Sequence, residues 1–575
     1  MASIQKYFDD ELRYLNEKGQ EFAKEFPEKA SQLNMYSLGD RDPYIERLFE
    51  GFAFLTSRVQ QRLDNDFPEV AENLLELIAP EYLRPVPSLC MLEMSTRNGL
   101  LEKSLTLPKG ARVSSNPVGK SLTPCQFQTS KSVDIFPMAL KSASPITDME
   151  NGKGIKLTFQ LEKGVDISSI TTNSLCMYVY GDKAQAWSLI NAITSSKSKV
   201  LVEINDVLQS QTMIKTPVFY QGGFSPEEEL LPGNKSSLGY EGFIHELFSF
   251  DEKFRFIEID SVDFLKNAQN VSKFSISIFS EFFNKIHISD YDGVFRLFVT
   301  PLVNLFTLQA NPINLDLKSF EYEITTEKNR DIYSVDEVVG IEKNTGKRSS
   351  YRPYTDSLNS NQIPYIFRRH QNKQNTYGGV ISVDLPDSIA HIREEYLSIS
   401  LQVTDGNLPR HEVPINGISI VSGDFPRYIM VTNITRPSST LYPPDKKDHL
   451  WYVLNHLNTN MTSLCQGDNL KKILELYIWT PNSPYKKLID SLISVSSESA
   501  SFIINNAYTR GVEVHIKFKD SFFENEGEAQ LFGKVMLHFL TRYVSINYLV
   551  SLRFVSESTE KDLYWKPLEG QCQAL

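Results

Sequence analysis

The first 88 residues carry apolar side chains at spacings of three and four, which is the repeat of an amphipathic helix. The first run covers residues 4–26 and includes Gly19, where the missing side chain lets a neighbouring helix approach closely. A second run opens at Asp42-Pro43 and a third at Phe67-Pro68, and three prolines between residues 80 and 87 end the pattern. The sequence therefore predicts three consecutive helices, each with one apolar face.

These predicted helices offer more apolar surface than three short elements need to cover one another. In the second helix, the side chains expected to be buried are Ile45, Leu48, Phe49, Phe52, Leu55, Val59 and Leu63. In the third helix, one face is expected to carry Val70, Leu74, Leu77 and Ile78. Two interpretations follow from the surplus. The helices form an ordinary antiparallel subdomain, or they present an apolar face that is shared with partner chains.

Composition limits the class of protein. The chain has 575 residues, which is enough for three or four domains, and its 59 basic residues stand against 71 acidic ones, a formal net charge of −12. This charge balance does not favour binding to nucleic acid, which needs basic patches that face the phosphates. Residues 1–85 hold 17 acidic and 10 basic residues, which would suit a basic partner surface.

The cysteines and the hydropathy indicate a cytoplasmic location. The five cysteines are Cys90, Cys125, Cys176, Cys465 and Cys572, and their spacing supports neither a disulfide framework nor a zinc cluster. No basic leader with an apolar core opens the chain, and no window approaches the roughly 20 apolar residues of a membrane helix. The sequence therefore predicts a soluble protein with no direct membrane insertion.

After residue 88 the pattern changes from helical to extended. Short alternating runs such as 155–161 and 396–404 are typical of half-buried strands. The expected fold is α+β. Its four parts are an N-terminal helical region 1–88, a β-rich domain 89–238, a second β-rich domain 239–435 and a C-terminal mixed α/β domain 436–575, in which strand 511–518, a helix after Gly527 and strand 548–554 follow one another.

A search for catalytic motifs finds little. The stretch 340–348 has five residues between its glycines and Arg348 where a phosphate-binding loop needs a hydroxyl, so Asn344-Thr345-Gly346 is better explained as a hairpin turn. The nine histidines form no His-x-x-x-His pair, and no Gly-x-Ser-x-Gly elbow occurs. We expect no enzyme activity, no catalytic residue, no metal site and no cofactor.

Several blocks of the chain resemble one protein family. They are Tyr7-Phe8-Asp9-Asp10-Glu11-Leu12-Arg13-Tyr14-Leu15, the run from Asp42-Pro43-Tyr44-Ile45-Glu46-Arg47-Leu48 to Leu55, residues 239–260, and Thr300-Pro301-Leu302-Val303-Asn304-Leu305-Phe306. They are similar to the TssF (ImpG/VasA) family of the bacterial type VI secretion system. Two departures occur: Asp251 stands where the family has proline, and Thr404-Asp405-Gly406-Asn407 replaces the usual Thr-Asn-Arg-Asp.

The resemblance implies a structural subunit of the type VI baseplate wedge. It implies assembly with TssG (two copies of this chain per TssG), TssE and TssK, self-association within the wedge, and contact with neighbouring wedges around the VgrG spike. The ring would nucleate tube and sheath polymerisation in the cytoplasm, docked at the inner-membrane complex. Within this interpretation, the residues expected to bind partners are Leu15, Phe22, Phe49 and Phe52.

An alternative from another class stays open at this point. β-Sandwich domains with a helical cap are also found in soluble enzymes and carbohydrate-binding proteins, which need a concave site with convergent polar groups. Co-purification with several proteins would favour the first interpretation, and turnover or stabilisation by a small ligand would favour the second.

Overall fold

The chain divides into two units, described separately here. The helical unit comprises Met1–Ile78 and Asp445–Leu454, and the sheet unit comprises Ala79–Pro444 and Asn455–Leu575. The computed structural model describes residues 4–28, 43–97, 100–101, 103–119, 122–162, 164–165, 174–205, 207–208, 218–232, 242–260, 271–286, 288, 291–316, 319–326, 330–354, 362–371, 376–383, 395–444, 447–457, 459–480, 483–504 and 507–572.

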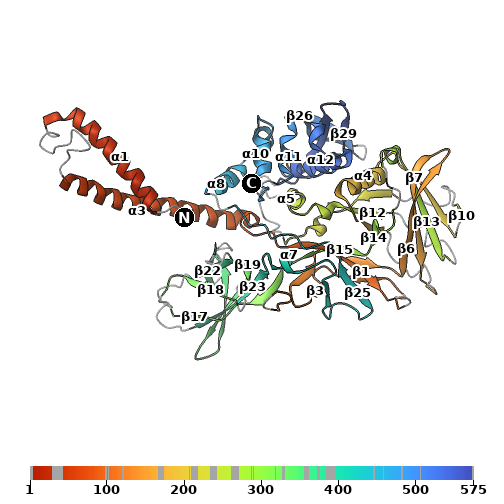
Figure 1. Ribbon diagram of the computed structural model, residues 1–575, viewed down its shortest axis with the longest axis horizontal. Helices are drawn as coiled ribbons and strands as arrows, with labels where there is room; N and C mark the ends of the chain where they lie inside the picture. Colours follow the sequence, from red (N-terminus) through yellow and green to blue (C-terminus); the bar gives the residue numbers. More distant parts are fainter. Residues whose placement is uncertain are drawn as a thin grey trace. The chain divides into compact units, whose positions relative to one another are not determined.

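Two long helices make up most of the helical unit. Figure 1 shows α1 (Ile4–Glu25) folded back beside the first half of α3 (Pro43–Ile78), and α3 continuing beyond it. The sequence prediction of a separate third helix from Phe67-Pro68 is wrong, because α3 is continuous over 36 residues. Pro68 removes one backbone hydrogen bond. Ala53 and Ala71 are both buried and lie five turns apart, so the buried face keeps one helical phase across the proline.

The sheet unit is built from six sheets, which confirms the expected α+β class. The six-stranded sheet has the order β24 (Ile418–Val421), β3 (Arg112–Ser115), β4 (Gln126–Thr129), β15 (Val299–Val303), β1 (Leu89–Thr96), β25 (Ile429–Asn433). A five-stranded sheet has the order β10 (Val207–Leu208), β9 (Lys199–Ile204), β13 (Lys273–Phe279), β7 (Gly152–Leu161), β6 (Met138–Asp148). A four-stranded sheet has the order β11 (Val218–Gln221), β12 (Phe256–Asp260), β8 (Ser174–Val179), β14 (Phe295–Leu297). The strands β2 (Leu105–Leu107) and β5 (Val133–Ile135) pair with each other.

The largest sheet has eight strands. Its order is β16 (Phe306–Gln309), β23 (Glu395–Thr404), β19 (Asp331–Glu342), β20 (Arg348–Pro353), β21 (Ile363–Gln371), β22 (Tyr377–Val383), β18 (Tyr322–Ile324), with β17 (Ile313–Leu315) also paired to β23. Strands β19 and β20 are antiparallel, and the Gly346 amide donates to the Glu342 carbonyl at 2.9 Å. This geometry confirms the predicted hairpin turn at Asn344-Thr345-Gly346.

Strand pairing joins segments that are far apart in the sequence. Strand β1 pairs with β15 on one side and with β25 on the other, so three ranges separated by more than 100 residues share one core. That core includes Cys90, Leu302 and Val431, all buried. The predicted boundary at 238/239 thus falls between strands that pair with each other.

The C-terminal part has the strand–helix–strand order expected from the sequence. Strands β27 (Ala507–Phe518) and β28 (Leu549–Ser556) are parallel, and α12 (Glu526–Thr541) connects them and packs on β28. Parallel strands require such a crossover. The rings of Phe518 and Phe554 stack at 4.0 Å between centroids on this sheet. The remaining strands are β26 (Leu492–Ile504), β29 (Asp562–Tyr564) and β30 (Leu568–Glu569).

The chain also contains shorter helices. They are α4 (Lys183–Thr194), α5 (Gly242–Ser249), α7 (Leu408–Glu412), α8 (Lys447–Leu457), α9 (Met461–Leu464), α10 (Asn469–Glu475) and α11 (Lys486–Asp490). Helix α12 packs on both α4 and α5. Three-residue to five-residue 3₁₀ turns are η1 (Pro80–Tyr82), η3 (Pro226–Glu228), η4 (Asp251–Phe254), η6 (Glu281–Lys285) and η7 (Asp520–Phe522). Among the helices in the described part of the chain, none combines the length and the apolarity needed to span a membrane.

The α4–α12 contact leaves no space for a side chain at Gly527. A Cβ atom there would lie 2.2 Å from the Trp187 carbonyl oxygen, whereas one at Gly51 in α3 would meet nothing within 4 Å. We therefore expect Gly527→Ala to destabilise the sheet unit by about 1–3 kcal/mol, because backbone must move. Gly51→Ala should raise helix stability by about 1 kcal/mol. Differential scanning calorimetry checks both, and equal melting of wild type and Gly527→Ala would contradict the prediction.

Candidate partner-binding surface

Small residues form the contact between α1 and α3. Among the side chains that the structure describes, the buried ones of α1 are Gly19 and Ala23, and those of the first half of α3 are Ala53 and Ser57. The Ser57 hydroxyl donates to the Phe54 carbonyl at 2.8 Å within its own helix, so its polar group is satisfied. Small side chains let two helices approach closely, but they cover little of the large apolar side chains on either helix.

The large apolar side chains of α3 point away from this contact. Exposed residues form what we call the outer stripe: Tyr44, Leu48, Phe52, Leu55, Val59, Val70, Leu74 and Leu77. At 100° per residue, the first five fall within an arc of about 80°, roughly opposite to Ala53 and Ser57. The expectation that Leu48, Phe52, Leu55 and Val59 are buried is therefore wrong for the single chain. The side chains of Ile45 and Leu63, also expected to be buried, lie outside the described residues. The residues of the outer stripe thus stay exposed in the single chain, whereas Ala53, Ser57, Ala71 and Leu75 of the same helix are buried.

The four predicted partner-binding residues differ in their positions. Phe52 is 57% exposed and lies in the outer stripe. Phe49 is half-buried and lies between the stripe and the α1 contact. On α1, Leu15 is half-buried, whereas Phe22 is 37% exposed and its ring lies 5.2 Å from that of Phe26. Only Phe52 of the four belongs to the stripe.

Two further exposed aromatic residues of the helical unit had not been singled out as partner-binding. Trp451 and Tyr452 in α8 are exposed, while their neighbours Leu450 and Val453 are buried. The signal available in the sequence was the pair of aromatic residues on the side of α8 opposite its apolar positions. Exposed tryptophan and tyrosine are over-represented among residues that dominate binding energy at interfaces.

In the sheet unit, two of the family-like blocks meet in one polar cluster. The Asn304 side-chain amide donates to Asp405 Oδ2 at 2.9 Å, and the Asp405 backbone amide donates to Asn304 Oδ1 at 2.8 Å. Arg330 completes the cluster, with its Nε 3.0 Å from Asp405 Oδ1. Burial raises the pKa of Asp405, and the arginine opposes that shift. Asn304 and Asp405 stand 101 positions apart, so this arrangement ties β15 to the end of β23.

The block 239–260 contains a buried ion pair. The Lys253 ammonium contacts a Glu246 carboxylate oxygen, and both side chains are almost fully buried. The other Glu246 oxygen accepts the Leu230 backbone amide at 2.7 Å. The lysine also lies 4.7 Å from the centre of the Phe243 ring. A buried charge needs such partners, since an unpaired one costs several kcal/mol.

Two histidines beside this pair are held neutral. Burial lowers the pKa of His245 to about 3, and its ring lies 4.3 Å from that of Trp479. Burial, with Lys534 and Lys253 nearby, lowers the pKa of His538 to about 4. Both rings therefore pack as neutral aromatic groups at pH 7, which is a structural role.

No candidate metal site stands out in the part of the chain that the structure describes: no group of three or more His, Cys, Asp or Glu residues there could hold an ion. The polar clusters above have their charges paired internally, which suits the locking of remote segments together. The outer stripe, by contrast, is a row of exposed apolar side chains on a long helix, described at residues 44–59 and 70–77. Such surfaces mark interaction sites.

The comparisons with known proteins point to one family over nearly the whole chain. The family model described as "Type VI secretion system, TssF" matches residues 1–572. The relative named "Type VI secretion system component TssF1" from Pseudomonas aeruginosa (strain PAO1) is 24% identical over 590 residues, covering 94% of this chain and 94% of the relative.

Two solved structures share the fold. One chain from a structure of the TssK-TssF-TssG baseplate subcomplex, obtained by cryo-electron microscopy, matches with a TM-score of 0.77 and 25% identity, covering 92% of this chain and 99% of that one. A chain from "The baseplate complex from the type VI secretion system" matches with a TM-score of 0.63 and 22% identity over 100% of both, which shows the fold alone.

The neutral histidines predict a pH dependence of stability. The pKa of His245 is lowered in the folded state. Its contribution to the free energy of unfolding is therefore present above the ordinary pKa of 6.5 and is lost as the pH falls from 6.5 towards about 3. Each such histidine makes the free energy of unfolding fall more steeply with decreasing pH, by up to about 1.4 kcal/mol per pH unit. We expect His245→Phe to flatten the fall of the urea midpoint between pH 7 and pH 4. His411→Gln, at an exposed position, is the control, and parallel curves for His245→Phe and wild type would contradict the assignment.

Proposed function

The chain belongs to the TssF family of the type VI secretion system, and from this premise we propose that it is a structural subunit of the baseplate that assembles with TssG and TssK. The observation that carries the proposal is the family match over residues 1–572, together with a solved relative of nearly the same length that is part of such a complex. A structural role needs no catalytic residue, and we propose none.

We assign the outer stripe to contacts with partner helices. Its anchors recur at spacings of three and four within residues 44–59 and again within 70–77, which is how an amphipathic helix enters a groove or a bundle. The first half of the stripe, from Tyr44 to Val59, is free of charged residues on its own arc, and Phe52 lies at its centre. Covering these side chains would remove apolar surface from water that the single chain leaves exposed.

The stoichiometry and the further contacts of the assembly are proposed from what membership of the family implies. We propose that two copies of this chain join one TssG, that TssE, the VgrG spike and neighbouring wedges are further contacts, and that the baseplate docks at the inner-membrane complex. Leu15, Phe22, Phe49 and Phe52 are the predicted partner-binding residues. Phe52 and Phe22 suit this role best, because their rings are already accessible.

A pull-down of the tagged chain from its native cells tests the role. Native mass spectrometry of the purified complex should give two copies of this chain for each TssG. A single copy would contradict the stoichiometry but not the role. A monomer with no partner would contradict the baseplate proposal itself.

A matched pair of substitutions tests the outer stripe. Phe52 and Phe54 are 57% and 49% exposed on the same helix, but Phe54 points about 120° away from the stripe. Because both side chains are exposed, neither Phe52→Glu nor Phe54→Glu buries a charge in the single chain, and circular dichroism should show both folded. We expect Phe52→Glu to weaken partner capture at least about tenfold, as for the loss of a central interface anchor. Equal loss in both variants would exclude the stripe as the contact face.

A further inference from the structure

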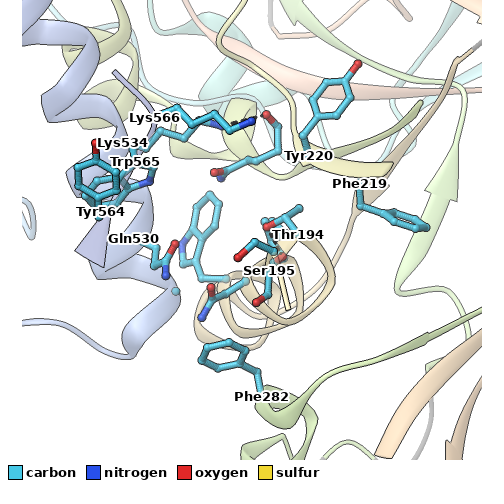
Figure 2. A pocket seen from close by; sticks show the side chains of 16 residues that line it. Thr194, Ser195, Phe219, Tyr220, Phe282, Gln530, Lys534, Tyr564, Trp565 and Lys566 are labelled. Carbon is cyan, nitrogen blue, oxygen red and sulfur yellow. Dashed lines mark hydrogen bonds between the residues drawn. The ribbon is translucent and has the colours of Figure 1, made fainter. Parts of the chain in front are cut away.

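A cavity of about 320 Å³ lies in the sheet unit where α4, β11, η6, α12 and the C-terminal segment converge. Figure 2 shows Thr194 and Ser195 at the end of α4, Tyr220 on β11, Gln530 and Lys534 on α12, and Trp565 from the C-terminal segment around it. Trp565 is held in place because its ring fills the space at Gly533, where a Cβ atom would lie 2.3 Å from the indole. The cavity is thus made by the tertiary structure and not by one loop.

The lining combines aromatic faces with groups that donate hydrogen bonds. Among the described residues that line the cavity, the charged ones are Lys534 and Lys566, and there is no carboxylate. Amide and hydroxyl side chains, including Gln530 and Ser195, face the same space (Figure 2). Lys566 is exposed and Tyr564 is 54% exposed, so one side opens to solvent. This donor set suits an anionic group beside an apolar one.

Lys534 is the central residue of the site. Its ammonium donates to the Gln221 carbonyl at 3.2 Å and lies 4.0 Å from the centre of the Phe224 ring. An ammonium has three donors, and this is the one hydrogen bond that the structure gives it among the described residues. Donor capacity therefore remains for a ligand in the cavity.

The surrounding charges do not neutralise this lysine. Glu228 and Glu258 attract it, but both contact Lys131, with Lys131 Nζ 3.2 Å from Glu258 Oε1. His538, with its lowered pKa, adds no positive charge near pH 7. Burial still lowers the pKa of Lys534 to about 8, so the nearby carboxylates compensate its desolvation only in part.

We propose that this cavity receives a carboxylate of a partner protein, either an acidic side chain or a C-terminus, with an apolar neighbour packed against the aromatic wall. The inference rests on the proposed baseplate role, because it assigns the site to a partner chain. A volume near the lower end of the range for small-molecule sites fits one or two inserted residues. Charged hydrogen bonds of this kind are among the stronger contacts at interfaces.

Chemical footprinting of the purified complex and of the isolated chain tests the proposal. We expect acetic anhydride to modify Lys534 at least about tenfold more slowly in the complex, and a carbodiimide to cross-link Lys534 or Lys566 to a carboxylate of another chain. Lys285 lies outside the cavity, is largely exposed and serves as the control lysine. A complex that forms while Lys534 reacts as in the isolated chain would overturn this inference and leave the baseplate role intact. If no complex forms, this inference and the baseplate role are both contradicted.

Two further measurements separate the remaining outcomes. Citrate added to the isolated chain is the probe for a free small acid, and protection of Lys534 by citrate without protection in the complex would overturn the assignment to a protein partner. Lys534→Met retains a long aliphatic side chain beside Phe224, so the melting temperature should not fall. It should weaken partner binding by roughly tenfold to a hundredfold, as for a lost charged hydrogen bond, and unchanged binding would count against the site.

Discussion

The close contact of α1 and α3 through small side chains determines how the helical unit can be used. Among the described side chains of α1 and of the first half of α3, the buried ones are Gly19, Ala23, Ala53 and Ser57. Most of the large apolar residues of α3 are exposed on the opposite face, where this chain alone does not cover them. That exposed face is the surface we propose for contacts with other chains.

The sheet unit has the complementary property, since its buried charges are paired within the chain. Lys253 pairs with Glu246 seven residues away, whereas Asp405, with Arg330 and Asn304, connects segments that are remote in the sequence. Removing one member of such a pair leaves the other buried without compensation, which costs more than the pair contributes. These clusters therefore favour one arrangement of the sheets. A fixed shape is what a structural component of a large assembly requires.

The local pattern of apolar residues predicted helices and strands, but it could not predict which strands pair across long distances in the sequence. Alternation along 155–161 correctly indicated β7, and the order 511–518, helix, 548–554 correctly indicated the α12 crossover. The predicted start of a separate helix at Phe67-Pro68 is wrong. Keeping Ala53 and Ala71 buried on one face of a continuous helix outweighs one lost hydrogen bond. Periodicity also could not say which residues of an apolar face meet a neighbour, since Phe52 and Ala53 are adjacent and both apolar. The pairing of β1 with β15 and β25, and the bond between Asn304 and Asp405, join positions for which the sequence carries no mutual signal.

The continuity of α3 has a mechanical consequence. At 1.5 Å per residue, its 36 residues make a rod about 54 Å long. A tilt of roughly 5° at one end of such a rod displaces the other end by about 5 Å, a shift comparable to one helical turn. A small rotation at one end of α3 would thus become a sideways shift of that size at the other end. A continuous α3 therefore has the geometry of a lever.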